Sequence, residues 1–447
     1  MAGQHRTGQF RYRTGDQALV RQINLSVIMH QLRENAPISR AALAEMTGLN
    51  KSTVSSLVRE LIERQFVREV GLESPGAGRG AGRLAMLLTL DPGAGYVASL
   101  EIGVDFLLAI CTNFAPEVIW RKSEEIKPEM GQQVIVDRAL ALLHQAVEAG
   151  RRECKTLLGV AVGVPGLVDQ HSGNLLFAPN LQWENVPIGA YLRDAFDSLI
   201  IVDNEASLSA LGEHYFGAAQ NCDEVLYISA GVGLGGGIVH DGRMFSGVSG
   251  FGAEFGHMTM DPDGLLCNCG NQGCWETQVS QRTLFRNIRL GIETGRSSLI
   301  ADLIGEDLSR LTIPLLVEAA RAGDALVLEN LEMIGHKLGI GIASLVNALN
   351  PDLVVFGGIL STAGEYLLPA IEEELQQRAL RWNRSVTQVV TARHGFNACV
   401  MGGVAKVYQA ILAEPDAVRT PNAWISPFQF NHSGGGLVRK EVKDETE

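Results

Sequence analysis

The chain has 447 residues, of which 46% are hydrophobic and 19% are charged, values that exclude global disorder. This length suggests about two to four domains, and the 50 glycines show no three-residue period, which excludes collagen. The N-terminus is polar and basic, and no run of about 18 uninterrupted apolar residues occurs. The sequence therefore predicts a cytoplasmic protein without a signal peptide or membrane span.

The formal net charge of -13 is unevenly distributed. Residues 1–90 carry twelve Arg or Lys against seven acids, a net charge of +5, which leaves -18 for the rest of the chain. A basic first segment before an acidic body is expected when one part of a protein contacts phosphate and the other does not. The charge of the whole chain would argue against nucleic acid as a partner, whereas the charge of the segment favours it.

Three helices are predicted in the basic segment, over residues 16–34, 40–46 and 51–64. Asp16 can cap the first helix and Asn50 the third. Thr47-Gly48 ends the second helix, so the second and third helices match a helix-turn-helix. Apolar residues recur at helical spacing in the first helix, at Leu19, Ile23, Val27 and Leu32.

The third helix begins with short polar side chains, which fit a major groove about 12 Å wide and can reach base edges. Two predicted strands, 66–70 and 84–88, enclose a Gly/Arg loop over 76–83 that resembles a wing. A small helical subdomain that only packs against the body is the alternative. We expect a winged helix-turn-helix DNA-binding domain over residues 1–90, with contacts from Arg40, Lys51, Ser52, Thr53, Ser55, Ser56, Arg59, Arg79 and Arg83.

From Asp91 onward, apolar strands, Gly turns and helices alternate, which predicts an α/β body. A stretch from about residue 413 to residue 447 has little periodicity and fits a partly disordered tail. The predicted elements are a hairpin of strands 96–102 and 106–111, a helix over 134–151, strands 157–164 and 199–202, a helix ending at 214, and strands 225–229 and 353–356.

A glycine-rich run follows the strand 225–229, with glycines at positions 231, 233, 235, 236 and 237. Glycines let backbone amides approach an anion, so the run can be a phosphate-binding loop. Glycines also form tight hairpins, and the sequence supports both interpretations equally.

The strongest local chemistry is a set of four metal-binding side chains within eighteen residues: His257, Cys267, Cys269 and Cys274. These ligands suit a closed, structural, tetrahedral zinc site of the Cys3His type. In a cytoplasmic chain clustered thiols favour metal over disulfide, and ordinary buried cysteines are the alternative. Glu254 and Glu276 flank the cluster, so a metal that fixes this loop would also fix two acceptors for sugar hydroxyls.

The run Glu254-Phe255-Gly256-His257, followed by Cys267-x-Cys269-Gly270-x-x-Gly273-Cys274-x-Glu276, closely resembles the signature of the ROK family. This family comprises repressors, open reading frames and sugar kinases. The resemblance covers nearly all of residues 91–412, and the segment 16–90 resembles the winged head of the repressor branch. Further matches are Ala178-Pro179-Asn180-Leu181 with Trp183, Val186-Pro187, Asn204-Glu205-Ala206, Ala210-Leu211-Gly212-Glu213 and Phe356-Gly357-Gly358.

The resemblance implies a two-lobed, actin-like (ribonuclease H-like) sugar-kinase fold over 91–412. Its small lobe would comprise about 91–202 with a C-terminal helix of about 400–412, and its large lobe about 203–399. By the family's motif, His257 would contact sugar and also bind zinc through its other ring nitrogen. Glu205 stands where the kinases have a catalytic Asp, so the geometry of a base is altered. The implied sugar contacts are Asn180, Glu205, Glu254, His257 and Glu276.

A second departure lies at the phosphate turn Asp-x-Gly-Gly-Thr of the family's kinases, which reads Glu101-Ile102-Gly103-Val104-Asp105 here. Val104 and Asp105 place a branched side chain and an anion where ATP phosphates would lie, and an anion disfavours a polyphosphate. The sequence therefore predicts a protein that is not an enzyme. Glu205 and the glycine-rich run favour the alternative, an ATP-dependent sugar kinase with a DNA-binding head.

The resemblance implies a sugar-responsive transcriptional repressor of carbohydrate-utilisation genes that binds operator DNA, expected as a homodimer. The sequence does not distinguish an activator from a repressor, because the difference depends on where the operator lies relative to the promoter. The segments 178–187 and 204–206 resemble those of xylose repressors more than those of the N-acetylglucosamine branch. Xylose is therefore the favoured effector, with glucose as an alternative.

Overall fold

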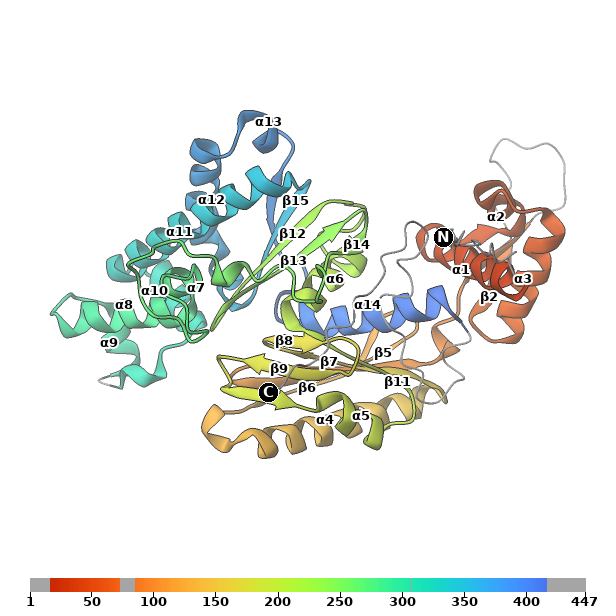
Figure 1. Ribbon diagram of the computed structural model, residues 1–447, viewed down its shortest axis with the longest axis horizontal. Helices are drawn as coiled ribbons and strands as arrows, with labels where there is room; N and C mark the ends of the chain where they lie inside the picture. Colours follow the sequence, from red (N-terminus) through yellow and green to blue (C-terminus); the bar gives the residue numbers. More distant parts are fainter. Residues whose placement is uncertain (1–16, 73–84, 306, 416–447) are drawn as a thin grey trace, which may run out of the picture. The chain divides into compact units, whose positions relative to one another are not determined.

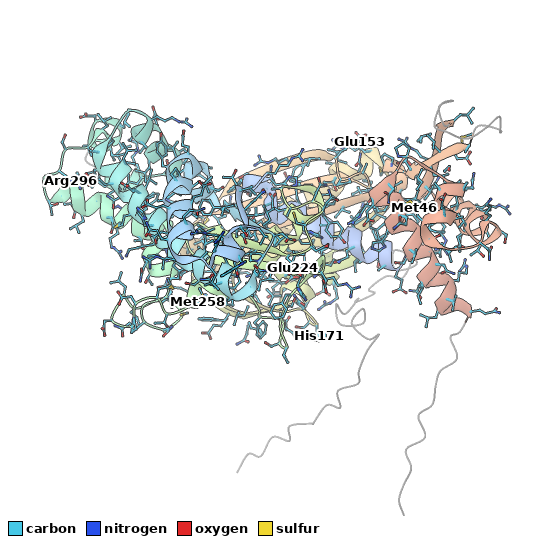
Figure 2. The ribbon with its side chains drawn as sticks, turned by 90° about the horizontal axis from the view of Figure 1, so that it is seen from above. Met46, Glu153, His171, Glu224, Met258 and Arg296 are labelled. Atoms are coloured by element: carbon cyan, nitrogen blue, oxygen red, sulfur yellow. The ribbon has the colours of Figure 1, made fainter. Side chains whose placement is uncertain are left out.

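The computed structural model describes residues 17–72, 85–305 and 307–415, which form two compact units (Figure 1). The head unit comprises the described residues up to Gly95, together with Asn113–Glu117 and the stretch that begins at Tyr408. The body unit comprises Tyr96–Thr112 and Val118–Val407. Figure 2 marks Met46 on the head unit and Glu224 and Met258 on the body unit.

The head unit contains three helices and a small antiparallel sheet in the order β1-β3-β2. The Asn50 side chain caps α3 by accepting the N–H of Thr53 at 2.8 Å, and Gly48 makes the turn between α2 and α3 at a φ of 70°. The helix-turn-helix and both wing strands are thus confirmed. The elements are α1 (Gln17–Asn35), β1 (Ile38–Ser39), α2 (Arg40–Thr47), α3 (Lys51–Glu63), β2 (Val67–Leu72) and β3 (Met86–Leu90).

Helix α1 forms where the sequence predicts it, but of the four apolar residues predicted to face the core only Leu32 does so. Leu19 and Ile23 are 52% and 53% exposed, and Val27 is exposed as well. The helix is apolar on two sides, and the side that packs comprises Leu25, Ile28, Met29 and Leu32. The predicted cap Asp16 and the loop 76–83, with Arg79 and Arg83, lie outside the described residues.

The first sheet of the body unit has the strand order β11-β7-β4-β5-β6. Strands β4, β7 and β11 are parallel and mostly apolar, as expected for strands that are covered on both faces. Helices α4 and α5 cover one face, and α14 packs on the other (Figure 1). The elements are β4 (Tyr96–Ile102), β5 (Phe106–Asn113), β6 (Val118–Glu125), α4 (Gln132–Glu153), β7 (Leu157–Val164), α5 (Ile188–Ala195), β11 (Leu199–Asn204) and α14 (Ala398–Ala413).

The second sheet has the order β14-β13-β12-β15-β16, and a three-stranded sheet β10-β9-β8 lies beside the first one. The second sheet packs on a core of helices that centres on Trp275 and α11. The elements are β8 (Leu167–Asp169), β9 (Asn174–Ala178), β10 (Trp183–Val186), α6 (Glu205–Phe216), β12 (Val225–Ala230), β13 (Leu234–His240), β14 (Arg243–Met244), α7 (Glu276–Val279), α8 (Gln281–Glu293), α9 (Leu299–Ile304), α10 (Ile313–Arg321), α11 (Ala325–Leu349), β15 (Leu353–Gly357), α12 (Gly364–Arg378), α13 (Arg381–Arg384) and β16 (Gln388–Thr391).

The glycine-rich run forms the β12–β13 hairpin, in which Ser229 pairs with Gly235 and Ala230 with Leu234. Glycine at position 237 lets helix α6 lie close against β13. A Cβ added to Gly237 would meet the Cβ of Ala210 at 2.5 Å. The glycine-rich run therefore has the conformation of a tight hairpin, which is one of the two interpretations that its sequence supports.

Within the described part of the chain, one stretch, Gly395–Ala413, is long and apolar enough to cross a membrane by length and composition. The protein itself buries 72% of this stretch. Burial of this kind is typical of the core helix of a soluble protein.

Candidate functional site

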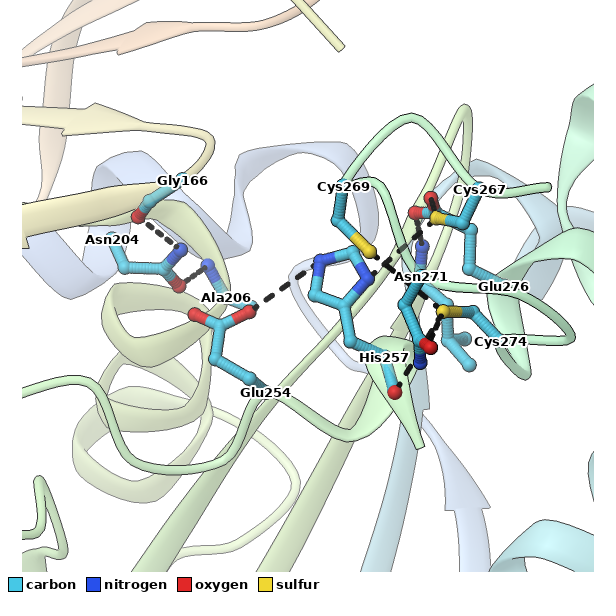
Figure 3. A network of polar contacts seen from close by, with 11 residues as sticks. Gly166, Asn204, Ala206, Glu254, His257, Cys267, Cys269, Asn271, Cys274 and Glu276 are labelled. Carbon is cyan, nitrogen blue, oxygen red and sulfur yellow. Dashed lines mark hydrogen bonds and ion pairs between the residues drawn. The ribbon is translucent and has the colours of Figure 1, made fainter. Parts of the chain in front are cut away.

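The four predicted metal ligands lie together beside the second sheet (Figure 3). The Sγ atoms of Cys269 and Cys274 are 3.8 Å apart, and the Sγ of Cys267 is 3.8 Å from Nδ1 of His257. All four ligand atoms lie within 4.8 Å of one another, and none of the three cysteines forms a disulfide. Tetrahedral zinc with Zn–S bonds near 2.3 Å separates its sulfur ligands by about 3.8 Å. The donor set and its spacing therefore fit such an ion.

Backbone contacts hold the loop with the three candidate cysteine ligands against the segment that follows His257. The N–H of Trp275 donates to the carbonyl of Met258 at 2.8 Å, and the N–H of Met260 donates to the carbonyl of Gly273 at 2.8 Å. Gly273 has a φ of 70°, and a Cβ at this position would lie 1.5 Å from the carbonyl oxygen of Asp261. Only glycine fits there, so the loop geometry depends on this residue.

His257 connects the cysteines to the carboxylate of Glu254. Its Nδ1 faces Cys267, while its Nε2 lies 4.0 Å from Oε2 of Glu254 (Figure 3). Burial raises the pKa of Glu254, the charge of His257 lowers it, and the charge of Glu276 raises it. The imidazole can therefore bind metal through one nitrogen and a ligand through the other.

Glu276 is a buried carboxylate, 8% exposed, at the first position of α7. Its Oε2 accepts the N–H of Leu234 at 3.1 Å, and its Oε1 lies 3.2 Å from the Sγ of Cys267. Glu276 thereby joins the metal-binding loop to the β12–β13 hairpin.

Asn180 follows β9 and approaches the same hairpin. Its Oδ1 accepts hydrogen bonds from Nδ2 of Asn268 at 3.0 Å and from Nη1 of Arg282 at 3.1 Å. A Cβ at Gly233 would lie 2.8 Å from Nδ2 of Asn180 and 2.4 Å from Oε2 of Glu276. The glycine at 233 thus leaves room for two predicted sugar contacts.

Sequence reasoning missed Asn268, Arg282 and the role of Gly233. For Asn268, the available signal was its position between the predicted ligands Cys267 and Cys269, because a side chain at this position is held in place together with the loop. Arg282 lies 102 positions from Asn180 along the chain, and nothing in the local pattern indicates that contact.

Glu205 is the first residue of α6, which Asn204 caps by accepting the N–H groups of Ala206 and Ser207. Figure 3 shows the contact of Asn204 with Ala206. Burial raises the pKa of Glu205 to about 8, and the charges of Glu101 and Glu254 add to this effect. Its Oε2 is buried without a hydrogen-bond partner. The position therefore favours a protonated carboxyl at neutral pH, which is a poor base.

Glu101 is the last residue but one of the central strand β4. Burial raises its pKa to about 8 as well, while a hydrogen bond from Cys399 lowers it. At the following turn, a Cβ on Gly103 would lie 2.4 Å from the Phe106 ring. This ring packs on Phe396 with 4.4 Å between centroids. The two aromatic rings fill the space beside the turn that resembles the kinase phosphate turn.

The predicted DNA contacts that the structure describes lie in the head unit. Lys51, Ser52, Ser56 and Arg59 are exposed on α3, and Thr53 and Ser55 are partly buried. Arg40 pairs with Glu69 of β2 at 2.9 Å, which connects α2 to the wing. The head thus presents a polar α3 face, as a recognition helix requires.

The described fold is a winged helix-turn-helix followed by an α/β body that carries a cluster of candidate metal ligands, and comparison with known proteins identifies its family. Residues 97–410 match the model of the ROK family, and residues 24–68 match a winged helix-turn-helix DNA-binding model. The chain belongs to the ROK family. Its architecture and its relatives support a sugar-responsive repressor.

The chain is 36% identical over 405 residues to the putative xylose repressor of Caldicellulosiruptor sp. (strain Rt8B.4), with 90% of this chain and 100% of the relative covered. A solved ROK family transcriptional regulator, a homologue of the E. coli MLC protein, has a TM-score of 0.77 and 27% identity, with 90% and 100% covered. A Streptomyces griseus ROK family glucokinase, solved with glucose and AMPPNP, has a TM-score of 0.63 and 30% identity, with 69% and 98% covered.

Proposed function

We propose that this protein represses carbohydrate-utilisation genes by binding an operator through its head and a monosaccharide through its body. The observation that carries the proposal is the combination, in one chain, of a helix-turn-helix and a carboxylate and amide cluster in contact with the loop of candidate metal ligands. The proposed division is a DNA-binding domain over 1–90, a sugar-binding domain over 91–412 with the two lobes implied by the family, and a tail over 413–447. The protein would act in the cytoplasm as a homodimer on two half-sites.

The sugar would be bound by hydrogen bonds from hydroxyl groups to carboxylates and from the Asn180 amide to a sugar oxygen. The negative charge of Glu276 raises the pKa of Glu254, so the two carboxylates repel each other. Vicinal hydroxyls that donate to both groups would relieve this repulsion. The proposed contacts are Asn180, Glu205, Glu254, His257 and Glu276.

Xylose is the first candidate for the effector, and glucose the second. A relative that covers 90% of the chain is named a putative xylose repressor, whereas a solved relative binds glucose. Both sugars are neutral and rich in hydroxyl groups, which suits acceptors such as Glu276.

Zinc is the metal proposed for His257, Cys267, Cys269 and Cys274. Three thiolates and one imidazole form a closed donor set, so the ion would stabilise the loop and leave no position for substrate. Its contribution would be to hold Glu276 and His257 in place.

We infer that the body does not phosphorylate its sugar. Val104, Asp105 and the Phe106–Phe396 contact would put apolar and acidic groups at the turn that resembles the phosphate turn of the family's kinases. The alternative of a kinase predicts sugar-dependent ADP release from ATP and Mg²⁺ at ordinary kinase rates. We expect no ADP release with xylose, glucose or N-acetylglucosamine.

Calorimetric titration of the purified chain with the same three sugars tests the proposed function. We expect saturable binding of xylose or glucose to the wild-type chain and its loss in Glu254→Ala. Saturable binding that survives this substitution would contradict the assignment of the site.

A further inference from the structure

Asn180 is the one amide among the proposed sugar contacts. The two ends of its side chain differ chemically, because Oδ1 accepts hydrogen bonds and Nδ2 donates them. The end that faces the sugar decides whether Asn180 binds the sugar as a donor or as an acceptor. The hydrogen bonds that this amide makes within the protein therefore determine what it can offer to a ligand.

Two hydrogen bonds fix the direction of the amide. Nη1 of Arg282 donates to Oδ1 of Asn180 at 3.1 Å, and Nδ2 of Asn268 donates to the same oxygen at 3.0 Å. A guanidinium carries donors only, so the end of the amide that faces Arg282 is the carbonyl oxygen. A carbonyl oxygen has two lone pairs, and these two contacts use both of them. Asn180 is therefore left with its N–H groups for a ligand.

The donor end of the amide lies near an acceptor. Nδ2 of Asn180 and Oε2 of Glu276 both lie against Gly233, at 2.8 and 2.4 Å from the position that a Cβ would take there. A hydroxyl group can accept one hydrogen bond and donate another. Hydroxyl groups of a sugar can therefore accept from Nδ2 of Asn180 and donate to a carboxylate beside it.

The two residues that donate to Asn180 come from different segments, and each segment is held in place. The N–H of Gln281, which precedes Arg282 on α8, donates to the carbonyl of Gly231 in the β12–β13 hairpin at 2.8 Å. Asn268 directly follows Cys267 in the loop of candidate metal ligands. Among the described residues Arg282 forms no ion pair, and its side chain donates to the amide oxygen. Fixed donors of this kind lower the cost of ordering the amide when a ligand binds.

We propose that Arg282 and Asn268 are positioning residues, which hold the amide of Asn180 with its N–H groups toward the sugar. The inference rests on the proposed function and adds how the site selects its ligand. Asn180 acts as a donor, so the sugar must present an acceptor oxygen to it, while the carboxylates accept hydrogen bonds from the sugar's hydroxyl groups.

Calorimetric titration of the full chain with xylose and with glucose tests this role. Without one of its two donors the amide must be ordered by the sugar itself, so Arg282→Ala and Asn268→Ala should each weaken binding by about two- to tenfold. Arg282→Lys keeps a cationic donor and should recover part of the lost affinity. Arg286→Ala is the matched control, because Arg286 is also exposed and lies one turn further along α8. Equal affinities of Arg282→Ala and Arg286→Ala would overturn the proposal.

A double-mutant cycle separates positioning from a direct contact with the sugar. If Arg282 acts through Asn180, Arg282→Ala should cause no further loss of affinity in a chain that already carries Asn180→Ala. Fold changes that multiply in the double variant would give Arg282 a contact of its own with the sugar, against the proposal.

Asn180→Asp tests the direction of the amide. It keeps an acceptor for Arg282 and Asn268 and removes the N–H groups, so it should bind sugar at least as weakly as Asn180→Ala. Wild-type affinity in Asn180→Asp would show that Asn180 does not act as a donor. A wild-type chain that binds neither xylose, glucose nor N-acetylglucosamine would overturn the proposed function together with this inference, whereas sugar binding that Arg282→Ala leaves unchanged would overturn the inference alone.

Discussion

The Sγ of Cys267 lies 3.2 Å from Oε1 of Glu276, so a proposed metal ligand touches a proposed sugar ligand. The other oxygen of Glu276 accepts the N–H of Leu234 in the β12–β13 hairpin. A displacement of the metal-binding loop would therefore displace a sugar contact and the hairpin together. A variant that loses the metal should therefore also lose sugar affinity.

Replacement of Cys269 tests this coupling. Cys269→Ala removes one of four ligands, so we expect bound zinc to fall from about one per chain to near zero, and sugar affinity to fall by about tenfold or more. Metal analysis and calorimetry measure the two quantities. Cys222→Ala is the control, because Cys222 is also partly exposed and lies outside the cluster. A variant with full zinc and normal sugar affinity would show that the loop does not bind metal through Cys269.

A methyl group at Gly233 should damage the sugar site without touching the metal ligands. In Gly233→Ala the new Cβ would meet Asn180 and Glu276 at 2.8 and 2.4 Å, so one of these side chains must move. We expect sugar affinity to fall by about tenfold, as when roughly 1–3 kcal/mol of hydrogen bonding is lost. In the control Gly231→Ala the nearest atom lies at 3.8 Å, which is ordinary contact. Equal affinities of the two variants in calorimetry would count against the placement of Asn180 and Glu276.

The buried carboxyl of Glu101 predicts a particular dependence of stability on pH. Its pKa is raised from 4.5 to about 8, so from pH 4.5 to pH 8 the unfolded chain releases a proton that the folded chain keeps. Stability from this group is present at low pH and is lost as pH rises through this window. Glu101→Gln keeps an acceptor for Cys399 and removes the titration.

Thermal unfolding of the body at pH 5.5 and pH 8.5 measures this effect. The wild-type Tm should fall more between the two pH values than the Tm of Glu101→Gln, by about 2–4 °C for each kcal/mol involved. Glu153→Gln, at an exposed position on α4, should behave as the wild-type chain does. Identical pH dependence in Glu101→Gln and the wild-type chain would refute the raised pKa.

Arg59 tests the assignment of α3 as the recognition helix. It is exposed on α3, and Arg59→Ala should weaken operator binding and reduce the salt slope of the affinity by about one if it contacts a phosphate. Fluorescence anisotropy over a series of salt concentrations gives both values. Arg286→Ala, on the exposed side of α8, is the control. Unchanged affinity at fixed salt would remove Arg59 from the DNA contacts.

The local features of this chain could be predicted from its sequence, because each depends on neighbouring residues. The turn at Gly48, the cap at Asn50 and the clustering of Cys267, Cys269 and Cys274 are set within a few positions. The packing side of α1 could not be predicted in this way, because Ile23 and Ile28 lie on different apolar faces and only tertiary packing selects between them.

Contacts between segments that are distant in the chain could not be predicted from the sequence either. Phe106 and Phe396 are far apart in the chain and meet only after the first sheet and α14 have packed. The contact of Arg282 with Asn180 likewise depends on how the β12–β13 hairpin brings α8 toward β9. The sequence predicted that His257 and the three cysteines gather in one place, and it did not predict the residues that orient them.

The most direct test of the central claim is the affinity of the full chain for its operator, measured by fluorescence anisotropy with and without xylose or glucose. A sugar acts only through its different affinity for the DNA-bound and free forms, and a coupling of about 1–3 kcal/mol corresponds to a 5- to 150-fold change. We predict that a saturating sugar weakens operator binding within this range, and that Glu254→Ala abolishes the effect. Operator affinity that no sugar changes would contradict the account.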